Sequence, residues 1–458
     1  MYQINFKEPI HVYFCGIGGI SMSGLAEILL SRGFKISGSD MRASDITSGL
    51  ESKGMTVYIG QRADNITDDI DLFIYTAAIR EDNAEWLAMK EKNIPSLSRA
   101  ELLGEIMRNF ELPIAISGTH GKTTTTSMVS DILLSADLDP TITVGGILKS
   151  IDGNIRIGKS DYFVTEACEY TNSFLSFFPK ISIILNIEED HMDFFKDIND
   201  IRNSFSRFAS LLPTDGALII NGEIDNIPEI TAGLDAKVYT YGFDSNFDYY
   251  ATDITYDEKN RATYTCVSPI GSMTVTLGVP GIHNVSNSLA AICCADVCGV
   301  DRESIKNGLL RFGGADRRFQ HKGVIGNVTI IDDYAHHPTE IMTTLTTAKK
   351  CEHEKLWVVF QPHTYTRTKA FLTQFADALS IADGIILADI YAAREKNTIG
   401  ISSKDLQNEI IKKGKECYYF PTFDEIENFI LENCSPGDLL ITMGAGDIVK
   451  VGESLLGL

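Results

Sequence analysis

The sequence is short of positive charge and of long apolar runs. Its 458 residues hold 40 Lys and Arg against 62 Asp and Glu, which gives a formal net charge of -22. Such a field repels nucleic acid and anionic membrane surfaces, so we expect neither as a partner. No apolar stretch approaches the length of a membrane span, and Lys7, Glu8 and Pro9 interrupt the region where a secretory signal would have its apolar core. We therefore expect a cytoplasmic protein whose anionic ligands are bound by local Lys, Arg or metal.

Cysteine is present, but in no pattern that binds zinc or builds a disulfide framework. The nine Cys show no paired spacing, which suits a reducing compartment. Cys293, Cys294 and Cys298 lie close together in an Ala-rich stretch. We interpret them as buried small residues of a helix rather than as a metal cluster.

Short β-branched runs alternate with helical stretches along the whole chain, the pattern of parallel sheets covered by helices. With 44% hydrophobic residues and this length, we expect an α/β protein of about three domains. The first block closes near Arg108 and the second near the polar stretch 313–318, so the predicted domains are 1–108, 109–317 and 318–458. Strands are predicted at 10–16, 34–40, 114–118, 162–167, 181–187, 217–221, 328–333, 356–361, 384–389 and 438–443, with an insert of alternating Tyr, Thr and Val at 239–280.

The most informative segment is the glycine turn after the strand at 114–118. Gly118-Thr119-His120-Gly121-Lys122-Thr123-Thr124 leads from an apolar strand into a Thr-rich helix start, where backbone N–H groups can surround a polyphosphate. Lys122 would reach the β- and γ-phosphates, and the Thr123 hydroxyl would hold Mg²⁺. Ile116 stands where the usual pattern has its first glycine, yet the order of strand, glycines, Lys and hydroxyls favours an ATP or GTP site over a structural turn.

A second glycine turn, Gly16-Ile17-Gly18-Gly19-Ile20-Ser21, follows the first predicted strand, and Asp40 ends the next one. This nearly matches the dinucleotide fingerprint and suggests an NAD enzyme, but Ser21 replaces its third glycine. The same backbone can bind another diphosphate, such as a nucleotide sugar, or can be no more than a tight turn.

Polar residues also follow later strands and open a later helix. Glu166 ends one predicted strand, and the run 186–193, which contains His191, follows another; both can be metal ligands, or caps and solvated acids. The run 281–291 opens an Ala-rich helix, where His283 and Asn284 either cap the helix or face the edge of an adenine.

Taken in order, these segments resemble the Mur ligase family over essentially the whole chain. The resemblance implies an N-terminal Rossmann-like domain for a UDP-sugar, a central P-loop ATPase-type domain with a parallel sheet, and a C-terminal Rossmann-like domain for an amino acid. Within the family, the third-domain motifs and the turn at Gly16 are most similar to the branch that joins L-alanine to UDP-N-acetylmuramate, with ATP and Mg²⁺. The matching segments are 118–125, 186–193, 281–291, Arg317-Arg318-Phe319, Asp332-Asp333-Tyr334-Ala335-His336-His337-Pro338 and Gln361-Pro362-His363.

The resemblance also implies a role for each matching position. Catalytic roles fall to Lys122, His191, Arg318 and His336, and metal binding to Thr123, Glu166 and His191. ATP would contact Gly118, Thr119, His120, Gly121, Lys122, Thr123, Thr124, His283, Asn284, Asn287, Arg318 and, at its ribose, Asp333. The UDP-sugar would contact Gly16, Gly18, Gly19, Ser21 and Asp40, and the alanine would contact Tyr334, His336, His363 and Arg367.

The chain departs from the family pattern in three places. The acidic stretch after the strand Glu is Ala167-Cys168-Glu169-Tyr170-Thr171, which leaves contacts beyond Glu166 open. The usual Arg after the third-domain His is Thr364, which removes one clamp on the alanine carboxylate. The stretch 204–208 contains no Lys at the place where sister ligases use a carbamylated one, so we predict no carbamate.

No Ser/His/Asp triad or Cys/His pair lies near these motifs, so positioning and charge neutralisation must drive the reaction. The sugar's lactyl carboxylate would attack the γ-phosphate, giving an acyl phosphate and ADP, and the alanine amine would then displace phosphate; His336 or His191 could accept the amine proton. We expect the domains to close through hinges near Arg108 and Arg318. Three alternatives stay open: a recycling ligase that adds a preformed peptide to the same sugar, an NAD(P)-linked oxidoreductase, and a non-catalytic NTP-driven binding module.

Overall fold

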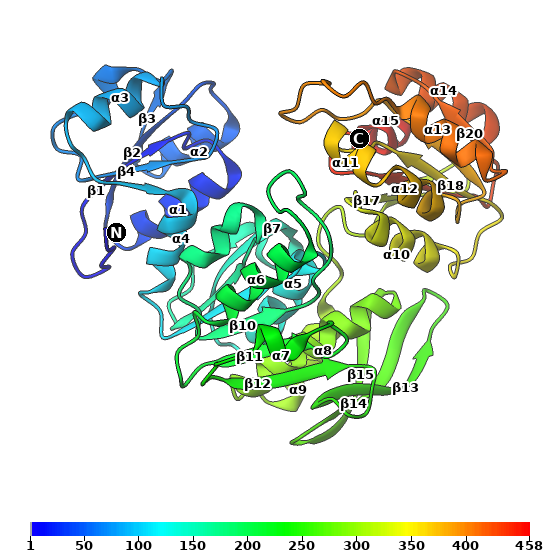
Figure 1. The fold of residues 1–458 in the computed structure, drawn as a ribbon, viewed down its shortest axis with the longest axis horizontal. Helices are drawn as coiled ribbons and strands as arrows, with labels where there is room; N and C mark the ends of the chain where they lie inside the picture. The colour runs from blue at the N-terminus through cyan, green and yellow to red at the C-terminus, as the bar shows by residue number, and fades with distance from the viewer. Residues whose placement is uncertain (1) are drawn as a thin grey trace.

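A computed structural model describes residues 2–458 as three sheets that follow one another along the chain, each flanked by helices (Figure 1). The first sheet has five parallel strands in the order β3-β2-β1-β4-β5. Its strands are β1 (His11–Cys15), β2 (Lys35–Asp40), β3 (Thr56–Ile59), β4 (Leu72–Tyr75) and β5 (Ser96–Ser98), and its helices are α1 (Ile20–Ser31), α2 (Asp45–Ser52), α3 (Ala84–Glu91) and α4 (Arg99–Met107).

The second sheet has ten strands and is extended by an antiparallel ribbon. The order is β15-β14-β13-β12-β11-β10-β6-β9-β7-β8; β13, β14 and β15 pair antiparallel, as do β7 and β8, and the remaining pairs are parallel. The strands are β6 (Leu112–Ser117), β7 (Thr141–Leu148), β8 (Gly153–Arg156), β9 (Tyr162–Glu166), β10 (Ile181–Ile184), β11 (Ala217–Asn221), β12 (Lys237–Gly242), β13 (Tyr249–Tyr256), β14 (Arg261–Ser268) and β15 (Gly271–Pro280). The helices are α5 (Lys122–Ser135), α6 (Ile198–Ala209), α7 (Ile227–Ile230), α8 (Ile282–Val297) and α9 (Arg302–Arg311).

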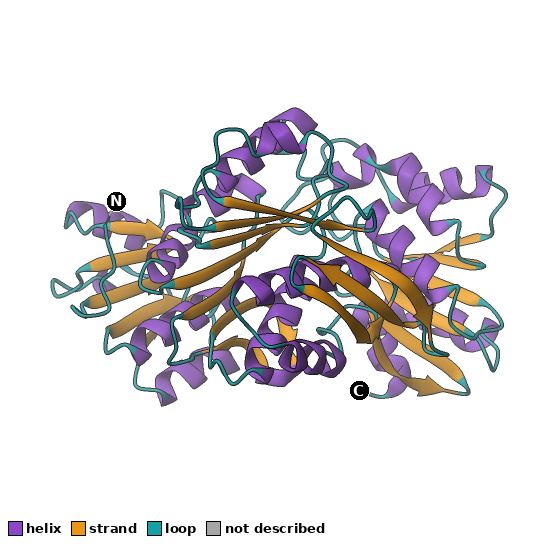
Figure 2. Ribbon diagram, turned by 90° about the horizontal axis from the view of Figure 1, so that it is seen from below, coloured by secondary structure: helices purple, strands orange, loops and turns teal. Residues whose placement is uncertain are grey.

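The third sheet has six strands in the order β16-β17-β21-β18-β19-β20, all parallel except the edge strand β16. The strands are β16 (Gln320–Ile325), β17 (Val328–Asp333), β18 (Leu356–Phe360), β19 (Gly384–Leu387), β20 (Cys417–Tyr419) and β21 (Leu439–Met443). The helices are α10 (Pro338–Ala348), α11 (Tyr365–Ala370), α12 (Leu372–Leu379), α13 (Ser403–Lys412), α14 (Phe423–Asn433) and α15 (Val449–Leu456), and they lie on both sides of the strands (Figure 2).

The expected α/β architecture is confirmed, and every predicted strand is present to within a few residues. The alternating insert forms β12 to β15, because a one-in, one-out pattern suits strands with one solvent-facing side. Seven strands were not predicted, namely β3, β4, β5, β7, β8, β16 and β20. Cys293 and Cys294 are fully buried in α8, as expected of small core residues, and Cys298 is half-buried just beyond it.

The first two sheets share one apolar core, whereas the third has its own. Val12 and Leu102 of the first unit belong to the same buried cluster as Phe163, Phe174 and Phe205 of the second. The contacts between the second and third units are instead mostly polar, as described below. No helix among residues 2–458 is long and apolar enough to cross a membrane.

Candidate active site

The phosphate loop is a tight turn between β6 and α5 that only glycine can make at two points. Gly118 and Gly121 have φ of +143° and +83°, and Gly121 precedes the first residue of α5. A Cβ on Gly121 would lie 2.8 Å from Oδ1 of Asn287, and one on Gly118 would lie 2.9 Å from Cβ of Leu185. The loop is therefore pressed against β10 and α8, with the N-terminus of α5 open toward a cavity.

Lys122 is paired with a buried carboxylate. Its Nζ lies 3.1 Å from Oε2 of Glu169, which is 2% exposed, and it also donates to the carbonyls of Gly118 and Thr119. Burial disfavours the ammonium, but the charge of Glu169 outweighs burial and holds the pKa of Lys122 above its usual value. Lys122 is thus charged and held beside the loop.

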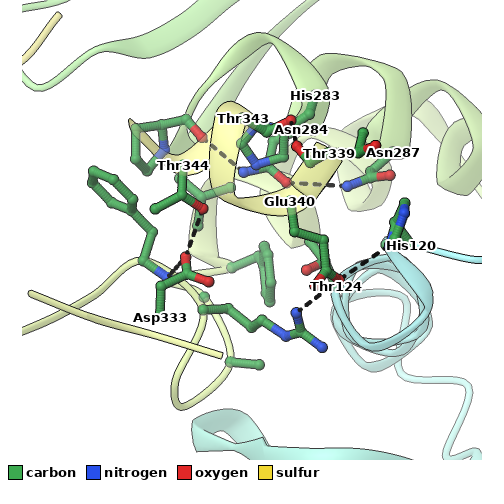
Figure 3. A pocket seen from close by; sticks show the side chains of 18 of the residues that line it. His120, Thr124, His283, Asn284, Asn287, Asp333, Thr339, Glu340, Thr343 and Thr344 are labelled. Atoms are coloured by element: carbon green, nitrogen blue, oxygen red, sulfur yellow. Dashed lines mark hydrogen bonds and ion pairs between the residues drawn. The ribbon is translucent and has the colours of Figure 1, made fainter. Parts of the chain in front are cut away.

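One cavity of about 270 Å³ lies between α5, α8 and α10 (Figure 3). Asn284 and Asn287 point into it from α8; Nδ2 of Asn287 donates to Oδ1 of Asn284 at 3.2 Å, and Nδ2 of Asn284 donates to the carbonyl of Pro280 at 2.7 Å. Nδ1 of His283 is buried without a partner among the described residues, and burial lowers the pKa of His283 to about 4. Neither His283 nor Asn284 caps α8; Asn284 is bonded to Pro280 and Asn287, whereas Nδ1 of His283 is left for a ligand.

Asp333 and Arg318 close the other side of this cavity. The Asp333 carboxylate accepts from the backbone N–H of Phe319 at 2.9 Å and from Oγ1 of Thr344 at 3.1 Å, and burial raises its pKa to about 6. The Arg318 guanidinium lies 3.7 Å from Glu340 and over the ring of Tyr334. Its neighbour Arg317 does not line this cavity; it donates to Asp332 at 3.0 Å and lies on the other side of the site, where it also contacts the Tyr334 ring.

His120 joins the second unit to the third. Its Nδ1 lies 3.2 Å from Glu340 on α10, and its Nε2 lies 3.5 Å from Glu188, which follows β10. Burial opposes the imidazolium, but Glu340 and Glu188 outweigh burial and raise the pKa of His120 to about 9. The ring is therefore a charged bridge between two carboxylates.

A larger cavity of about 630 Å³ lies in front of Lys122 and includes residues predicted for metal and catalysis. Thr123, Glu166 and His191 line it, as do Tyr334 and His336 from the third unit. Burial lowers the pKa of His336 to about 4, although Glu340 opposes this, so the ring is neutral near pH 7. The hydroxyl and carboxylate oxygens of Thr123 and Glu166 are ligands that suit Mg²⁺.

The predicted metal ligands are not the residues whose possible ligand atoms lie closest together. Among the described residues, that group is His120, Glu188 and His337, with one ligand atom each within 4.8 Å of the others. In this structure His120 links Glu188 and Glu340 by ion pairs, and Nε2 of His337 bonds to the carbonyl of Glu189. The Glu166 carboxylate accepts from the backbone N–H of Gly145 at 2.5 Å and caps no helix.

His363 and Arg367 line a neighbouring cavity of about 450 Å³. Nη2 of Arg367 donates to Oδ1 of Asp190 at 2.7 Å, and Nη1 lies 3.2 Å from Nδ1 of His363. Burial alone would raise the pKa of Asp190, but Arg367 holds it well below its usual value. Arg367 is therefore paired within the protein, across the junction between the second and third units.

The turn at Gly16 lines a cavity of about 530 Å³ in the first unit. The backbone N–H of Gly18 donates to Oδ2 of Asp40 at 3.0 Å, so this carboxylate holds the turn closed. Arg99 donates to Oγ of Ser21 at 3.1 Å and supplies positive charge beside the N-terminus of α1.

These cavities adjoin one another through shared residues. Ser21 and Arg99 line both the Gly16 cavity and an intervening cavity of about 350 Å³, which shares Glu166 and Cys168 with the Lys122 cavity. The Lys122 cavity shares Arg318 with the α8 cavity and His191 with the His363 cavity. Predicted site residues from all three units therefore line neighbouring cavities, although Gly18 and Gly118 line none of them.

Comparison with known proteins shows which family has this arrangement of domains. Residues 11–111 match the Mur ligase family catalytic domain, 116–295 the Mur ligase middle domain, and 317–446 the Mur ligase glutamate ligase domain. The chain belongs to the Mur ligase family. Among similar proteins, the UDP-N-acetylmuramate–L-alanine ligase of Agathobacter rectalis is 62% identical, and that of Lachnospira eligens is 59% identical, each over 100% of both chains.

Solved structures of Mur ligases give the same fold. The UDP-N-acetylmuramate–alanine ligase of Thermotoga maritima is 30% identical with a TM-score of 0.80, covering 98% of both chains. A murein peptide ligase of Psychrobacter arcticus is 24% identical with a TM-score of 0.71 at the same coverage. The second likeness shows the fold alone.

Four acidic residues of this Mur ligase site were not predicted: Glu169, Glu188, Asp190 and Glu340. Glu188 and Asp190 lie in the run 186–193, but which acids in it face other units depends on tertiary structure. Glu340 could have been noticed, because it stands three residues after His337 at the start of α10, where a Glu completes a capping box. Glu169 gives no such signal, since its partner Lys122 is distant in sequence.

Proposed function

We propose that the chain is an ATP-dependent ligase that joins L-alanine to the lactyl carboxylate of UDP-N-acetylmuramate, in the synthesis of peptidoglycan precursors. The observation that supports this most directly is the Lys122 cavity, where a phosphate loop from the second unit faces Tyr334 and His336 from the third. The full-length likeness to proteins named UDP-N-acetylmuramate–L-alanine ligase points to the same substrates.

The UDP-sugar binds at the Gly16 turn, where Gly16, Gly18, Gly19 and Ser21 present backbone and hydroxyl groups and Asp40 holds the turn. Its lactyl end extends through the cavity beside Arg99 to Glu166. ATP lies along α5, with its base at His283, Asn284 and Asn287, its ribose at Asp333 and its phosphates at the loop 118–124.

In the first step the lactyl carboxylate attacks the γ-phosphate, giving an acyl phosphate and ADP. Lys122 leaves Glu169 for the phosphates, and Arg318 approaches them from the opposite side, so two cations stabilise the charge on the transferred group. Mg²⁺ held by Thr123, Glu166 and His191 supplies further charge neutralisation when bound.

In the second step the amine of L-alanine displaces phosphate through a tetrahedral intermediate. Tyr334, His336 and His363 position the amino acid, while Arg367 holds Asp190 and the His363 ring in place. His336 is neutral near pH 7 and can accept the amine proton.

The domain boundaries 1–108, 109–317 and 318–458 and a cytoplasmic location belong to the same proposal. The boundaries fall between α4 and β6 and between α9 and β16. A cytoplasmic location fits an enzyme that uses ATP and has free cysteines.

Mass spectrometry of the products from UDP-N-acetylmuramate, ATP, Mg²⁺ and single amino acids tests the proposal. We expect a product that contains one alanine, together with ADP and phosphate. A product only with a preformed tripeptide would indicate a recycling ligase instead, and no ATP-dependent product with either would refute ligation.

A further inference from the structure

The loop between β19 and α13, residues 388–402, extends from the third unit toward the first (Figure 1). It is attached to the His363 segment at several points. The backbone N–H of Thr364 donates to the carbonyl of Tyr391 at 2.9 Å, and the N–H of Tyr391 donates to the carbonyl of Pro362 at 2.8 Å. The Glu395 carboxylate accepts from the N–H groups of Tyr365 at 2.7 Å and Thr366 at 3.0 Å. A long loop held this firmly is typical of a functional element.

Two residues of this region have strained backbone. Thr364 has φ of +64° and Ala393 has φ of +50°, the left-handed region that non-glycine residues rarely adopt, and both line the His363 cavity. Ala393 directly precedes Arg394, which lines the same cavity and also the Gly16 cavity. The surrounding bonds thus hold the backbone at Arg394 where the His363 cavity meets the Gly16 cavity.

The other charged groups around the His363 cavity already have ion-pair or hydrogen-bond partners. Asp190 binds Arg367, Asp193 accepts from the hydroxyl of Tyr170 at 2.7 Å, and Glu395 holds the backbone N–H groups named above. Arg394 is exposed and makes no ion pair or hydrogen bond with any of residues 2–458. It is the cation of this cavity that remains free for an anionic ligand.

We infer that Arg394 binds the α-carboxylate of the incoming amino acid and so determines that the ligase selects a free amino acid. This rests on the proposed function. Thr364 carries no charge, and the guanidinium of Arg367 is bonded to Asp190, so neither residue offers a free cation to the carboxylate. Arg394 offers a free guanidinium, which can donate two parallel hydrogen bonds to a carboxylate. Binding from the loop leaves Arg367 of α11 bonded to Asp190 and to the ring of His363.

The test compares two nucleophiles that differ only in the carboxylate, L-alanine and L-alaninamide, at saturating ATP and UDP-N-acetylmuramate. We expect Arg394→Ala to lower kcat/KM for L-alanine about ten- to a hundredfold, mainly through KM, and to leave kcat/KM for L-alaninamide nearly unchanged. Arg394→Lys should retain part of the preference, because it keeps the charge but loses the paired geometry. Lys396→Ala is the matched control, since it removes an exposed cation of the same loop that lines none of the cavities above.

Three results would overturn the inference. An equal loss with both nucleophiles would show a structural role, and a rise only in the KM for UDP-N-acetylmuramate would assign Arg394 to the sugar diphosphate. No change in either would show that Arg394 binds no substrate. If the unaltered protein forms no amide with L-alanine in the same assay, the proposed function fails, which is distinct from these results.

Discussion

At the scale of single residues, the ion pair between Lys122 and Glu169 determines what an incoming phosphate must displace. Their ion pair occupies the phosphate loop, and Glu169 is almost fully buried. A phosphate that binds Lys122 must therefore replace a carboxylate rather than water. The pair keeps the lysine charged and close to where it is needed.

Lys122→Ala should lower turnover by about a hundredfold or more, because one charged contact to the transferred phosphoryl group is worth about 3 kcal/mol. The same change leaves Glu169 buried without its partner, which costs about 3 kcal/mol or more of unfolding free energy. Phosphate release and thermal unfolding measure the two effects separately. The double variant Lys122→Ala with Glu169→Gln should recover stability but not turnover, and recovery of turnover in it would contradict the role of Lys122.

His120 makes stability depend on pH. Its pKa is raised from about 6.5 in the unfolded chain to about 9 in the folded one, so its contribution is complete below pH 6.5 and is lost as the pH rises through 9. A shift of this size corresponds to at most about 3 kcal/mol. His120→Gln should therefore destabilise the protein clearly at pH 6 and hardly at pH 10, measured by chemical unfolding.

The matched control is His321→Gln, at an exposed position on β16 without a carboxylate partner among the described residues. Its effect on the free energy of unfolding should be small at both pH values. A constant effect of His120→Gln across this range would mean that the imidazole is not the charged bridge.

At the level of elements, α4 packs against the second unit so closely that one of its residues must be glycine. A Cβ on Gly104 would lie 1.9 Å from the carbonyl oxygen of Ser176. In an isolated helix, Ala would be preferred over Gly by about 1 kcal/mol. Here the contact between helix and backbone reverses this preference.

Gly104→Ala should lower the unfolding temperature, because α4 or the segment at Ser176 must move apart. Gly49→Ala in the middle of α2 is the control, since nothing lies within 4 Å of its added Cβ, and it should stabilise the protein by about 0.5–1 kcal/mol. Equal stabilisation by both substitutions would show that α4 does not make this contact.

The elements differ in how well the sequence predicts them. Buried parallel strands such as Val328–Asp333 and Ala217–Asn221 were located to the residue, because continuous β-branched runs are a strong local signal. Strand β16 was missed, since Gln320–Ile325 reads as polar until β17 pairs with it. Among site residues, motif positions could be named, but Glu169 depends on its contact with Lys122, and Arg394 depends on where its loop lies in the fold. No rule of spacing predicts either of these.

For the whole molecule, the two junctions differ in physical character. The first and second units share an apolar core, which resists hinge motion near Arg108. The second and third meet through polar bonds, and the linker residues Arg317 and Phe319 have φ of +61° and +47°. We expect closure to occur mainly at the second junction.

Small-angle scattering should give a smaller radius of gyration with UDP-N-acetylmuramate and a non-hydrolysable ATP analogue than without ligands. Either ligand alone should give a partial decrease, because closure is a population shift that draws on contacts from both. Identical scattering in all four conditions, at saturating concentrations, would mean that the units are already fixed in place.

The shared core of the first two units also has a consequence for synthesis on the ribosome. Leu102 and Phe110 belong to one buried cluster with Phe163, Phe174 and Phe205, so the first 110 residues leave translation with an apolar face still bare. About 100 further residues must be added before that face can be buried, which takes about 5–20 s at bacterial rates. During that interval the nascent chain is a natural client for chaperones that bind exposed apolar surface.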